Sequence, residues 1–235
     1  MPLSHAACDA RTRAIFVNSP NNPTGWTMKR ADQEALLTFT RSRGLWLIAD
    51  EVYPRIVYDD RSAPSFLDFA EPEDGLIVVN SFSKAWAMTG WRLGWLIAPR
   101  QIQEIADKVV EFKFNTSCAP PFLQHAAVTA LEYGEPFVAQ MVQRCKEGRD
   151  VLVGGLARFP RVRVSPPAGA FYAFCRLEGV LDSVAFAKEV PAQCKVGVAP
   201  GAAFGIGDEG HLRLCFAKAP SQLMTALERL ASLLA

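Results

Sequence analysis

The 235-residue chain is poor in the features that mark several common protein classes. It has only three histidines, and its six cysteines form no Cys-x-x-Cys pair, so the sequence supports neither a metal site nor a redox motif. Its longest apolar runs are far shorter than the roughly 18 residues of a membrane span. The N-terminus also lacks the apolar stretch of a signal peptide. We therefore expect a cytoplasmic protein with free thiols, no metal and no membrane partner.

Neither sign of charge dominates the chain. The 25 basic and 24 acidic side chains leave a formal net charge of +1. Without a basic stripe, nucleic acid is not an expected partner. Half of the residues are hydrophobic, which is enough to form a sizeable core in one large domain or in a large and a small one.

Three apolar runs, each followed by a polar cluster, are the main positive signal. Residues 14–17, 45–49 and 75–80 have the length and composition of buried strands. The first is followed by an amide-rich turn, the second by Asp50, and the third by a Ser-x-Ser-Lys segment that ends at Lys84. Because ligands in open α/β sheets bind outside the carboxyl ends of the strands, we expect the three clusters to lie close together.

The third cluster carries the most specific chemistry. It contains Ser81, Ser83 and Lys84, and Arg92 follows eight residues after the lysine. Lysine is the side chain that condenses with carbonyl groups, while hydroxyls and the planar arginine fork suit phosphate oxygens. The alternative is a surface loop with a solvated lysine, which so short a motif does not exclude.

The other polar positions also have structural alternatives. Asp50 would serve equally well as the N-cap of a helix, and residues 22–25 (Asn-Pro-Thr-Gly) are ordinary turn residues. Arg213 lies in the otherwise apolar segment 212–216 and requires a partner if it is buried. An internal ion pair with Asp or Glu would provide that partner.

Taken in order, these motifs resemble one enzyme family. The turn at residues 22–25, the Asp50-x-x-Tyr53 pair, the Ser-x-Ser-Lys segment and Arg92 resemble the class I/II aminotransferases of fold type I, which use pyridoxal phosphate. Residues 200–205 and 211–214 resemble the C-terminal segments of that family. The resemblance extends from about residue 14 to the C-terminus, and several motifs in order are far more specific than any one alone.

The resemblance implies an α/β fold in three parts. Residues 1–125 would form part of the large pyridoxal-phosphate-binding domain, with a mostly parallel sheet and flanking helices. Residues 126–150 would form a connecting helix, and residues 151–235 a smaller C-terminal α+β domain. The sequence Gly-x-Gly-x-x-Gly at 205–210 precedes a predicted strand and opens no helix, so we do not interpret it as a dinucleotide-binding motif.

The resemblance also implies roles for the cofactor-binding residues. Lys84 would form the Schiff base with pyridoxal phosphate and carry a proton during the reaction. Asp50 would face the nitrogen of the pyridine ring and keep it protonated. Tyr53 and Asn22 would hydrogen-bond the phenolic oxygen of the cofactor.

The remaining roles concern anionic groups. Ser81, Ser83 and Arg92 would hold the cofactor phosphate, and Arg213 would bind the substrate α-carboxylate, with Asn22 beside it. The Asn22–Pro23 peptide bond would be cis.

By resemblance, the protein moves an amino group between an amino acid and a 2-oxo acid, and works as a homodimer when full length. Other reactions of the fold stay open, among them carbon–sulfur lyase, decarboxylase and cyclopropane-forming synthase, and so does a non-catalytic truncated paralogue. Family members carry a substantial segment before the first strand seen here, so we expect a fragment of the fold. The sequence does not name the substrate side chain.

Periodicity predicts the remaining elements. Helices are expected at residues 28–44, 100–113, 122–151 and 221–234, with Gly44 as a C-cap, Ser221 as an N-cap and an interruption near Gly134 and Pro136. Further short strands are expected at residues 92–98, 161–164, 171–174 and 212–216.

Overall fold

The computed structural model describes residues 7–59, 62–112, 119–205, 207 and 209–235. By its internal contacts the chain divides into two compact units. Unit 1 comprises Met1–Pro20, Met28–Arg55 and Ser62–Val138, and unit 2 comprises Asn21–Thr27, Ile56–Arg61 and Ala139–Ala235. The domain borders expected near residues 125 and 150 stay a prediction.

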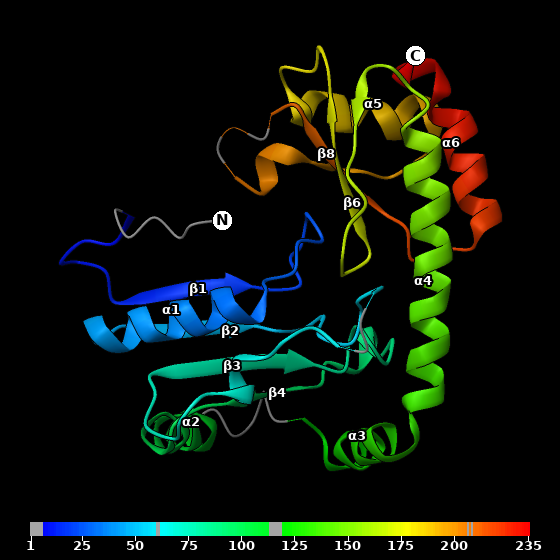
Figure 1. Cartoon of the computed structure of the whole chain (residues 1–235). Coiled ribbons are helices and arrows are strands. Elements are labelled where there is room, and N and C mark those ends of the chain that lie inside the picture. The colour runs from blue at the N-terminus through cyan, green and yellow to red at the C-terminus, as the bar shows by residue number, and fades with distance from the viewer. Residues whose placement is uncertain (1–6, 60–61, 113–118, 206, 208) are drawn as a thin grey trace. The chain divides into compact units, whose positions relative to one another are not determined.

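Unit 1 is built on a four-stranded sheet in the order β1-β2-β3-β4 (Figure 1). Its strands are β1 (Ala14–Asn18), β2 (Trp46–Asp50), β3 (Leu76–Ser81) and β4 (Gly94–Ile97). The first three run parallel, and β4 pairs with β3 antiparallel. All four predicted strands are present, but the strand expected from Arg92 begins only at Gly94.

Helix α1 (Arg30–Arg43) connects β1 to β2 and covers one face of the sheet. Leu36 and Leu37 of the helix pack on Leu47 and Val78 of the strands, which forms the main core of this unit. The helix ends where the sequence predicts, because Gly44 adopts the left-handed conformation, with φ 61°.

The strand order brings the polar clusters of unit 1 to one edge. Asn18 pairs in register with Asp50, and Asp50 with Val79, so β1, β2 and β3 end side by side. The Asn18 side chain donates a 3.1 Å hydrogen bond from Nδ2 to the backbone oxygen of Asp50. The residues that follow β2 and β3 therefore share the carboxyl edge, as expected for parallel strands.

Three helices follow the sheet along the chain. Helix α2 (Arg100–Phe112) and helix α3 (Pro121–Tyr133) belong to unit 1. Helix α4 (Glu135–Leu156) begins in unit 1 and continues in unit 2, and Gly134 interrupts the helical run as predicted. The end of the predicted helix at Lys113 lies outside the described residues.

Unit 2 contains an antiparallel sheet in the order β5-β6-β8-β7 (Figure 1). The strands are β5 (Val162–Arg163), β6 (Tyr172–Leu177), β7 (Ala199–Pro200) and β8 (His211–Cys215), and the helices besides α4 are α5 (Ser183–Cys194) and α6 (Pro220–Leu234). Helix α5 and strand β7 were not predicted. The prediction of Ser221 as an N-cap is wrong, because α6 begins at Pro220 with Ala219 as its N-cap.

The turn at residues 21–27 is attached to unit 2 through backbone pairing. Gly169 donates a 2.9 Å hydrogen bond to the oxygen of Gly25, and Val57 forms an antiparallel bridge with Gly169. Gly25 has φ 69°, and a Cβ atom there would lie 2.2 Å from the Cβ of Pro167. Glycine is required at this position by both the conformation and the close approach.

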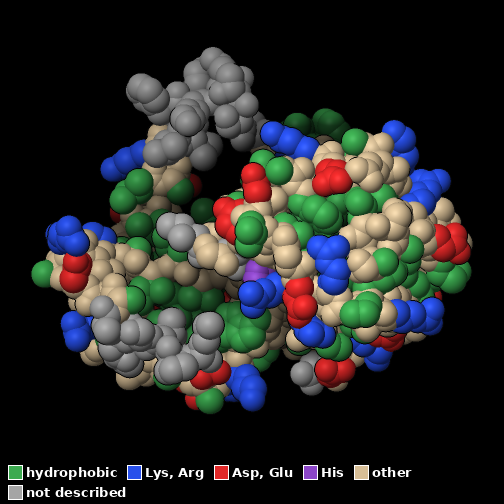
Figure 2. Space-filling view, turned by 90° about the horizontal axis from the view of Figure 1, so that it is seen from above, with side chains coloured by type: hydrophobic (Ala, Val, Ile, Leu, Met, Phe, Trp, Pro, Cys, Tyr) green, Lys and Arg blue, Asp and Glu red, His purple; other side chains and the backbone are tan. Residues whose placement is uncertain are grey.

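The surface carries charges of both signs. Figure 2 shows Lys and Arg side chains interspersed with Asp and Glu, and hydrophobic side chains between them. Among the described residues, no His, Cys, Asp and Glu side chains are grouped in a way that could hold a metal ion. The cysteines placed by the structure are free thiols. No helix in the described ranges is long and apolar enough to cross a bilayer.

Candidate active site

Lys84 and Asp50 are the charged residues at the centre of the unit 1 cluster. Lys84 lies in the turns that follow β3, and its Nζ atom is 5.6 Å from the centre of the Tyr53 ring. Asp50 is the last residue of β2 and is half-buried. The positive charge of Lys84 acts on the Asp50 carboxyl group, so the structure brings these two predicted site residues into one electrostatic environment.

Asp50 has a raised pKa. Burial is the main cause, because it disfavours the charged form, and it outweighs both the hydrogen bond from the backbone N–H of Val52 and the charge of Lys84. No helix begins within the described residues 51–59, which directly follow Asp50, so the alternative interpretation as a helix N-cap is wrong. The hydrogen bond and the lysine charge do not fully offset the cost of burying this carboxylate, so the group is suited to a cationic ligand.

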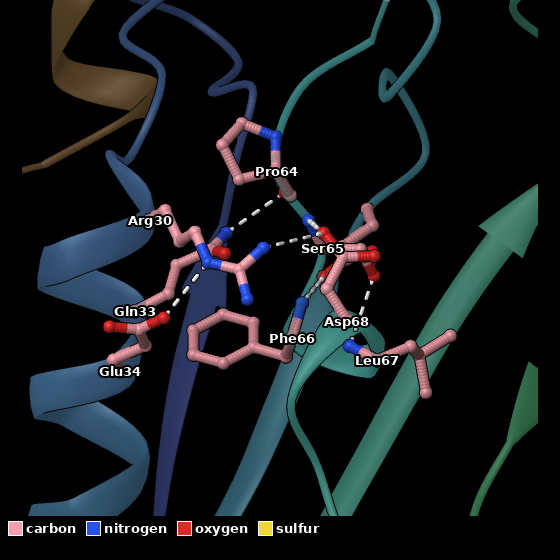
Figure 3. A network of polar contacts seen from close by, with 9 residues as sticks. Arg30, Gln33, Glu34, Pro64, Ser65, Phe66, Leu67 and Asp68 are labelled. Carbon is pink, nitrogen blue, oxygen red and sulfur yellow. Dashed lines mark hydrogen bonds and ion pairs between the residues drawn. The ribbon is translucent and has the colours of Figure 1, made fainter.

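Glu51, the next residue, has a structural environment that sequence analysis did not identify. Its carboxylate accepts a 2.7 Å hydrogen bond from Ser65 Oγ and a 3.0 Å bond from the backbone N–H of Phe66. Figure 3 shows this turn, with Ser65, Phe66 and Asp68 beside Arg30 of helix α1. Because Glu51 is only 4% exposed and its carboxylate is hydrogen-bonded on both oxygens, it stabilises the turn.

The predicted phosphate-binding residues lie on the segment between β3 and β4. Ser81 Oγ accepts a 3.0 Å hydrogen bond from the backbone N–H of Ser83 and donates one of 3.3 Å to the oxygen of Leu93. Arg92 is exposed and donates from Nη1 to the oxygen of Thr89 at 3.0 Å. The rest of its guanidinium has no acceptor among the described residues.

The same segment has an unusual backbone. Ala87 and Arg92 both have φ 53°, the left-handed region that non-glycine residues rarely adopt. Such conformations are costly and are concentrated at functional sites. The segment that carries Lys84 therefore departs from ordinary loop geometry at two positions.

Tyr53 is more enclosed than a ligand-binding phenol would need to be. Tyr53 is only 2% exposed. It lies close to the other site residues because the Nζ atom of Lys84 approaches its ring. Its hydrogen bond to the cofactor stays a prediction.

Unit 2 contains the other predicted site residues. Arg213 Nη1 donates a 2.8 Å hydrogen bond to Asn22 Oδ1, although 191 positions separate them in sequence. The Asn22–Pro23 peptide bond is cis, as the resemblance implied. The pairing of residues 21–27 with unit 2 is what places the Asn22 amide beside β8.

The surroundings of Arg213 differ from the ion-pair alternative. No carboxylate of the described residues pairs with it; its Cζ atom lies 4.2 Å from the Tyr172 ring centre and 4.9 Å from that of Phe204. Sequence analysis found neither aromatic partner. The arginine therefore contacts a neutral amide and two aromatic rings, and no carboxylate of the described residues pairs with its positive charge.

Comparison with known proteins agrees with these motifs. The family described as aminotransferase class I and II matches residues 3–230. The aspartate aminotransferase of Thermotoga maritima is 37% identical over 220 residues, which cover 94% of this chain and 55% of that protein. Aromatic-amino-acid aminotransferase 2 of Thermococcus litoralis is also 37% identical, with 95% of this chain and 58% of that protein covered.

Solved structures give the same result. The aromatic aminotransferase of Pyrococcus horikoshii superimposes with a TM-score of 0.86 at 36% identity, covering 95% of this chain and 60% of that one. The Thermotoga maritima enzyme superimposes with a TM-score of 0.85. The chain spans less than two thirds of the length of these relatives. On this match of sequence, motifs and fold, the chain belongs to the class I and II aminotransferase family.

Proposed function

We propose that the chain contributes the cofactor-binding lysine and the carboxylate-binding arginine of a pyridoxal-phosphate-dependent aminotransferase. The observation that carries the proposal is the placement of Lys84 against Tyr53 and in the field of Asp50, at the carboxyl edge of the unit 1 sheet. The proposed substrates are an amino acid and a 2-oxo acid, and the proposed assembly is a cytoplasmic homodimer.

The residues of unit 1 fit pyridoxal phosphate. The half-buried Asp50 carboxyl would hold the ring nitrogen. Burial disfavours the charged carboxylate, and a protonated ring nitrogen beside it would offset that cost. Ser81, Ser83 and Arg92 would hold the phosphate, and Tyr53 the phenolic oxygen. When bound, the cofactor supplies an aldehyde for covalent attachment and a ring that accepts electrons from the substrate Cα.

Lys84 would hold the cofactor covalently through Nζ. The same Nζ atom would also accept the proton from the substrate Cα, so one side chain would serve as covalent anchor and as general base. Arg213 would bind the α-carboxylate with its planar fork, which orients the Cα–H bond.

The test of this function is amino-group transfer in a full-length protein. The unmatched part of the Thermotoga maritima enzyme, joined to this chain, provides a chimera with the length of the relatives. With amino acid and 2-oxo acid present, we expect the amino group to appear on the 2-oxo acid, and Lys84→Ala to abolish transfer. Release of ammonia or loss of CO₂ without a new amino acid would show a different reaction.

A second test addresses the carboxylate. Arg213→Lys keeps the charge but loses the planar fork. In the chimera we expect it to weaken binding of amino acid and 2-oxo acid substrates together, by roughly 1.5–3 kcal/mol, with little change in cofactor affinity. If the half-reactions with both substrate classes keep their rates, Arg213 has a structural role and this part of the proposal fails.

A further inference from the structure

Arg213 lies against two aromatic rings that come from different elements of unit 2. Tyr172 begins strand β6, and its ring centre is 4.2 Å from the Arg213 Cζ atom. Phe204 follows the short 3₁₀ turn Gly201–Ala203, and its ring centre is 4.9 Å away. A guanidinium over an aromatic face is attracted by the ring quadrupole, and the attraction grows as water is removed.

The rings are held in turn by a cluster of aromatic side chains. Phe174 is the register partner of Arg213 in the β6–β8 pair. It meets Phe204 edge-on, with ring centres 5.9 Å apart at 83°, and stacks on His211 at 4.8 Å and 11°. We call Tyr172, Phe174, Phe204 and His211 the aromatic frame. Phe204 is held by Phe174, and Tyr172 is held by Phe171, whose ring centre lies 4.8 Å from its own, so the rings beside Arg213 have little freedom to move away.

The hydrogen-bond pattern complements the frame. Nη1 donates to Asn22 Oδ1, and none of the described residues accepts a hydrogen bond from Nε or Nη2. An arginine presents its donors in a rigid fork that matches a carboxylate. The amide therefore fixes one corner of the guanidinium and leaves the remaining donors of the fork available to a ligand.

We propose that Tyr172 and Phe204 are positioning residues that hold the Arg213 guanidinium ready for a carboxylate before any substrate binds. The proposal rests on the function proposed above and extends it to residues that do not touch the reacting atoms. A preoriented fork loses less conformational freedom on binding than a mobile one. Removal of either ring should loosen the guanidinium and weaken carboxylate binding without changing the charge.

The direct measurement is the rate at which the Arg213 guanidinium rotates about its Nε–Cζ bond. NMR follows it as exchange between the two Nη resonances in the ligand-free chimera described above. We expect slow rotation in the wild type and in Tyr172→Phe, which keeps the ring. Tyr172→Leu and Phe204→Leu should each speed rotation by roughly threefold or more. Phe186→Leu, which changes a half-buried ring on helix α5, is the matched control and should leave rotation unchanged.

Binding of pyruvate as the carboxylate probe gives the second measurement. We expect Tyr172→Leu and Phe204→Leu to raise its dissociation constant by roughly threefold to tenfold, while Tyr172→Phe keeps it. Unchanged rotation and affinity in both leucine variants, with the fold intact by circular dichroism, would overturn the proposal. A third outcome is that the leucine variants speed the rotation but the wild type does not bind pyruvate. That result would support the positioning role of the rings and count against the proposed carboxylate-binding function.

Discussion

Asp50 and Glu51 are adjacent carboxylic acids with different surroundings. Burial raises the pKa of both. Glu51 is fixed by Ser65 and Phe66. The carboxyl group of Asp50 accepts, among the described residues, one hydrogen bond of 3.2 Å from the N–H of Val52, and it lies in the field of the Lys84 charge. Asp50, the acid with fewer hydrogen bonds, is therefore the one that we propose for ligand binding.

The electrostatic pairing of Asp50 with Lys84 can be tested at the level of the residue. Lys84→Met removes the positive charge that lowers the pKa of Asp50, so that pKa should rise above its wild-type value. Because a raised folded-state pKa makes ionisation unfavourable for folding, the variant should also lose stability as pH rises through it. Carboxyl ¹³C NMR titration measures the pKa directly. Lys108→Met on the exposed face of α2 is the control; an equal response in both variants would mean that Lys84 does not act on Asp50.

Motif positions predicted the charged residues of the candidate site, but not all of their partners. Asp50 and Lys84 could be found because each follows an apolar run that reads as a buried strand. The rings around Arg213 could not, because Tyr172 reaches it through strand register and Phe204 through a turn nine residues earlier in the chain. Sequence spacing does not encode such contacts between distant segments.

At the scale of elements, the turn at residues 21–27 pairs with a segment of its own unit, unit 2, that lies far away in sequence. Its position depends on Gly25, whose backbone lies against Pro167 and the oxygen of Gly169. The pairing with Gly169 is what keeps the Asn22 amide within reach of Arg213.

Substitution of Gly25 tests this dependence. Gly25→Ala adds a Cβ atom 2.2 Å from the Cβ of Pro167 in a left-handed conformation, so it should destabilise unit 2 by roughly 2–4 kcal/mol. Gly179→Ala is the matched control in the same unit, because φ is also positive there but the nearest atom is the end of the flexible Arg161 side chain at 3.4 Å. Urea unfolding compares the two. Equal losses would show that backbone strain alone, and not close packing, requires glycine at 25.

Elements with a strong apolar pattern were predicted, and those with mixed signals were not. Strands β1, β2 and β3 are uninterrupted apolar runs, and α1 ends at its glycine. Helix α5 was missed because Pro191 lies inside it, although its Asp182 cap, which accepts a 2.8 Å bond from the N–H of Ala185, is a usable signal. The antiparallel direction of β4 could not be derived from its composition, because an apolar segment looks the same whether its strand runs parallel or antiparallel to its neighbour.

At the scale of the whole molecule, the unit 1 sheet has one covered face and one bare face. Phe16 and Ile48 are in register on the face opposite helix α1, and Val79 pairs with Leu96 on that same face. Phe16 is 64% exposed, Leu96 46% and Val79 36%. Parallel sheets are normally covered on both faces, and the matched relatives are longer, with this chain covering 55% to 58% of the curated ones named above.

The bare face predicts the behaviour of the 235 residues expressed alone. We expect poor solubility or a partly molten state, strong binding of the dye ANS, weak binding of pyridoxal phosphate and no turnover. Phe16→Thr with Leu96→Thr should reduce ANS binding, whereas Phe122→Thr on the exposed surface of α3 is the control outside the sheet. Light scattering and a half-transamination assay complete the test. A monodisperse dimer with measurable turnover would show that these residues form a complete minimal enzyme.

The attachment of pyridoxal phosphate to Lys84 is the central claim, and borohydride reduction tests it most directly. The chimera described above, saturated with pyridoxal phosphate, is reduced, digested and mapped by mass spectrometry, with Lys84→Ala treated in parallel. We predict a pyridoxyl group on the peptide that contains Lys84 and its loss in the variant, because this lysine lies beside Tyr53 and Asp50 at the carboxyl edge of the sheet. A dominant label on any other lysine, present equally in Lys84→Ala, would contradict the account.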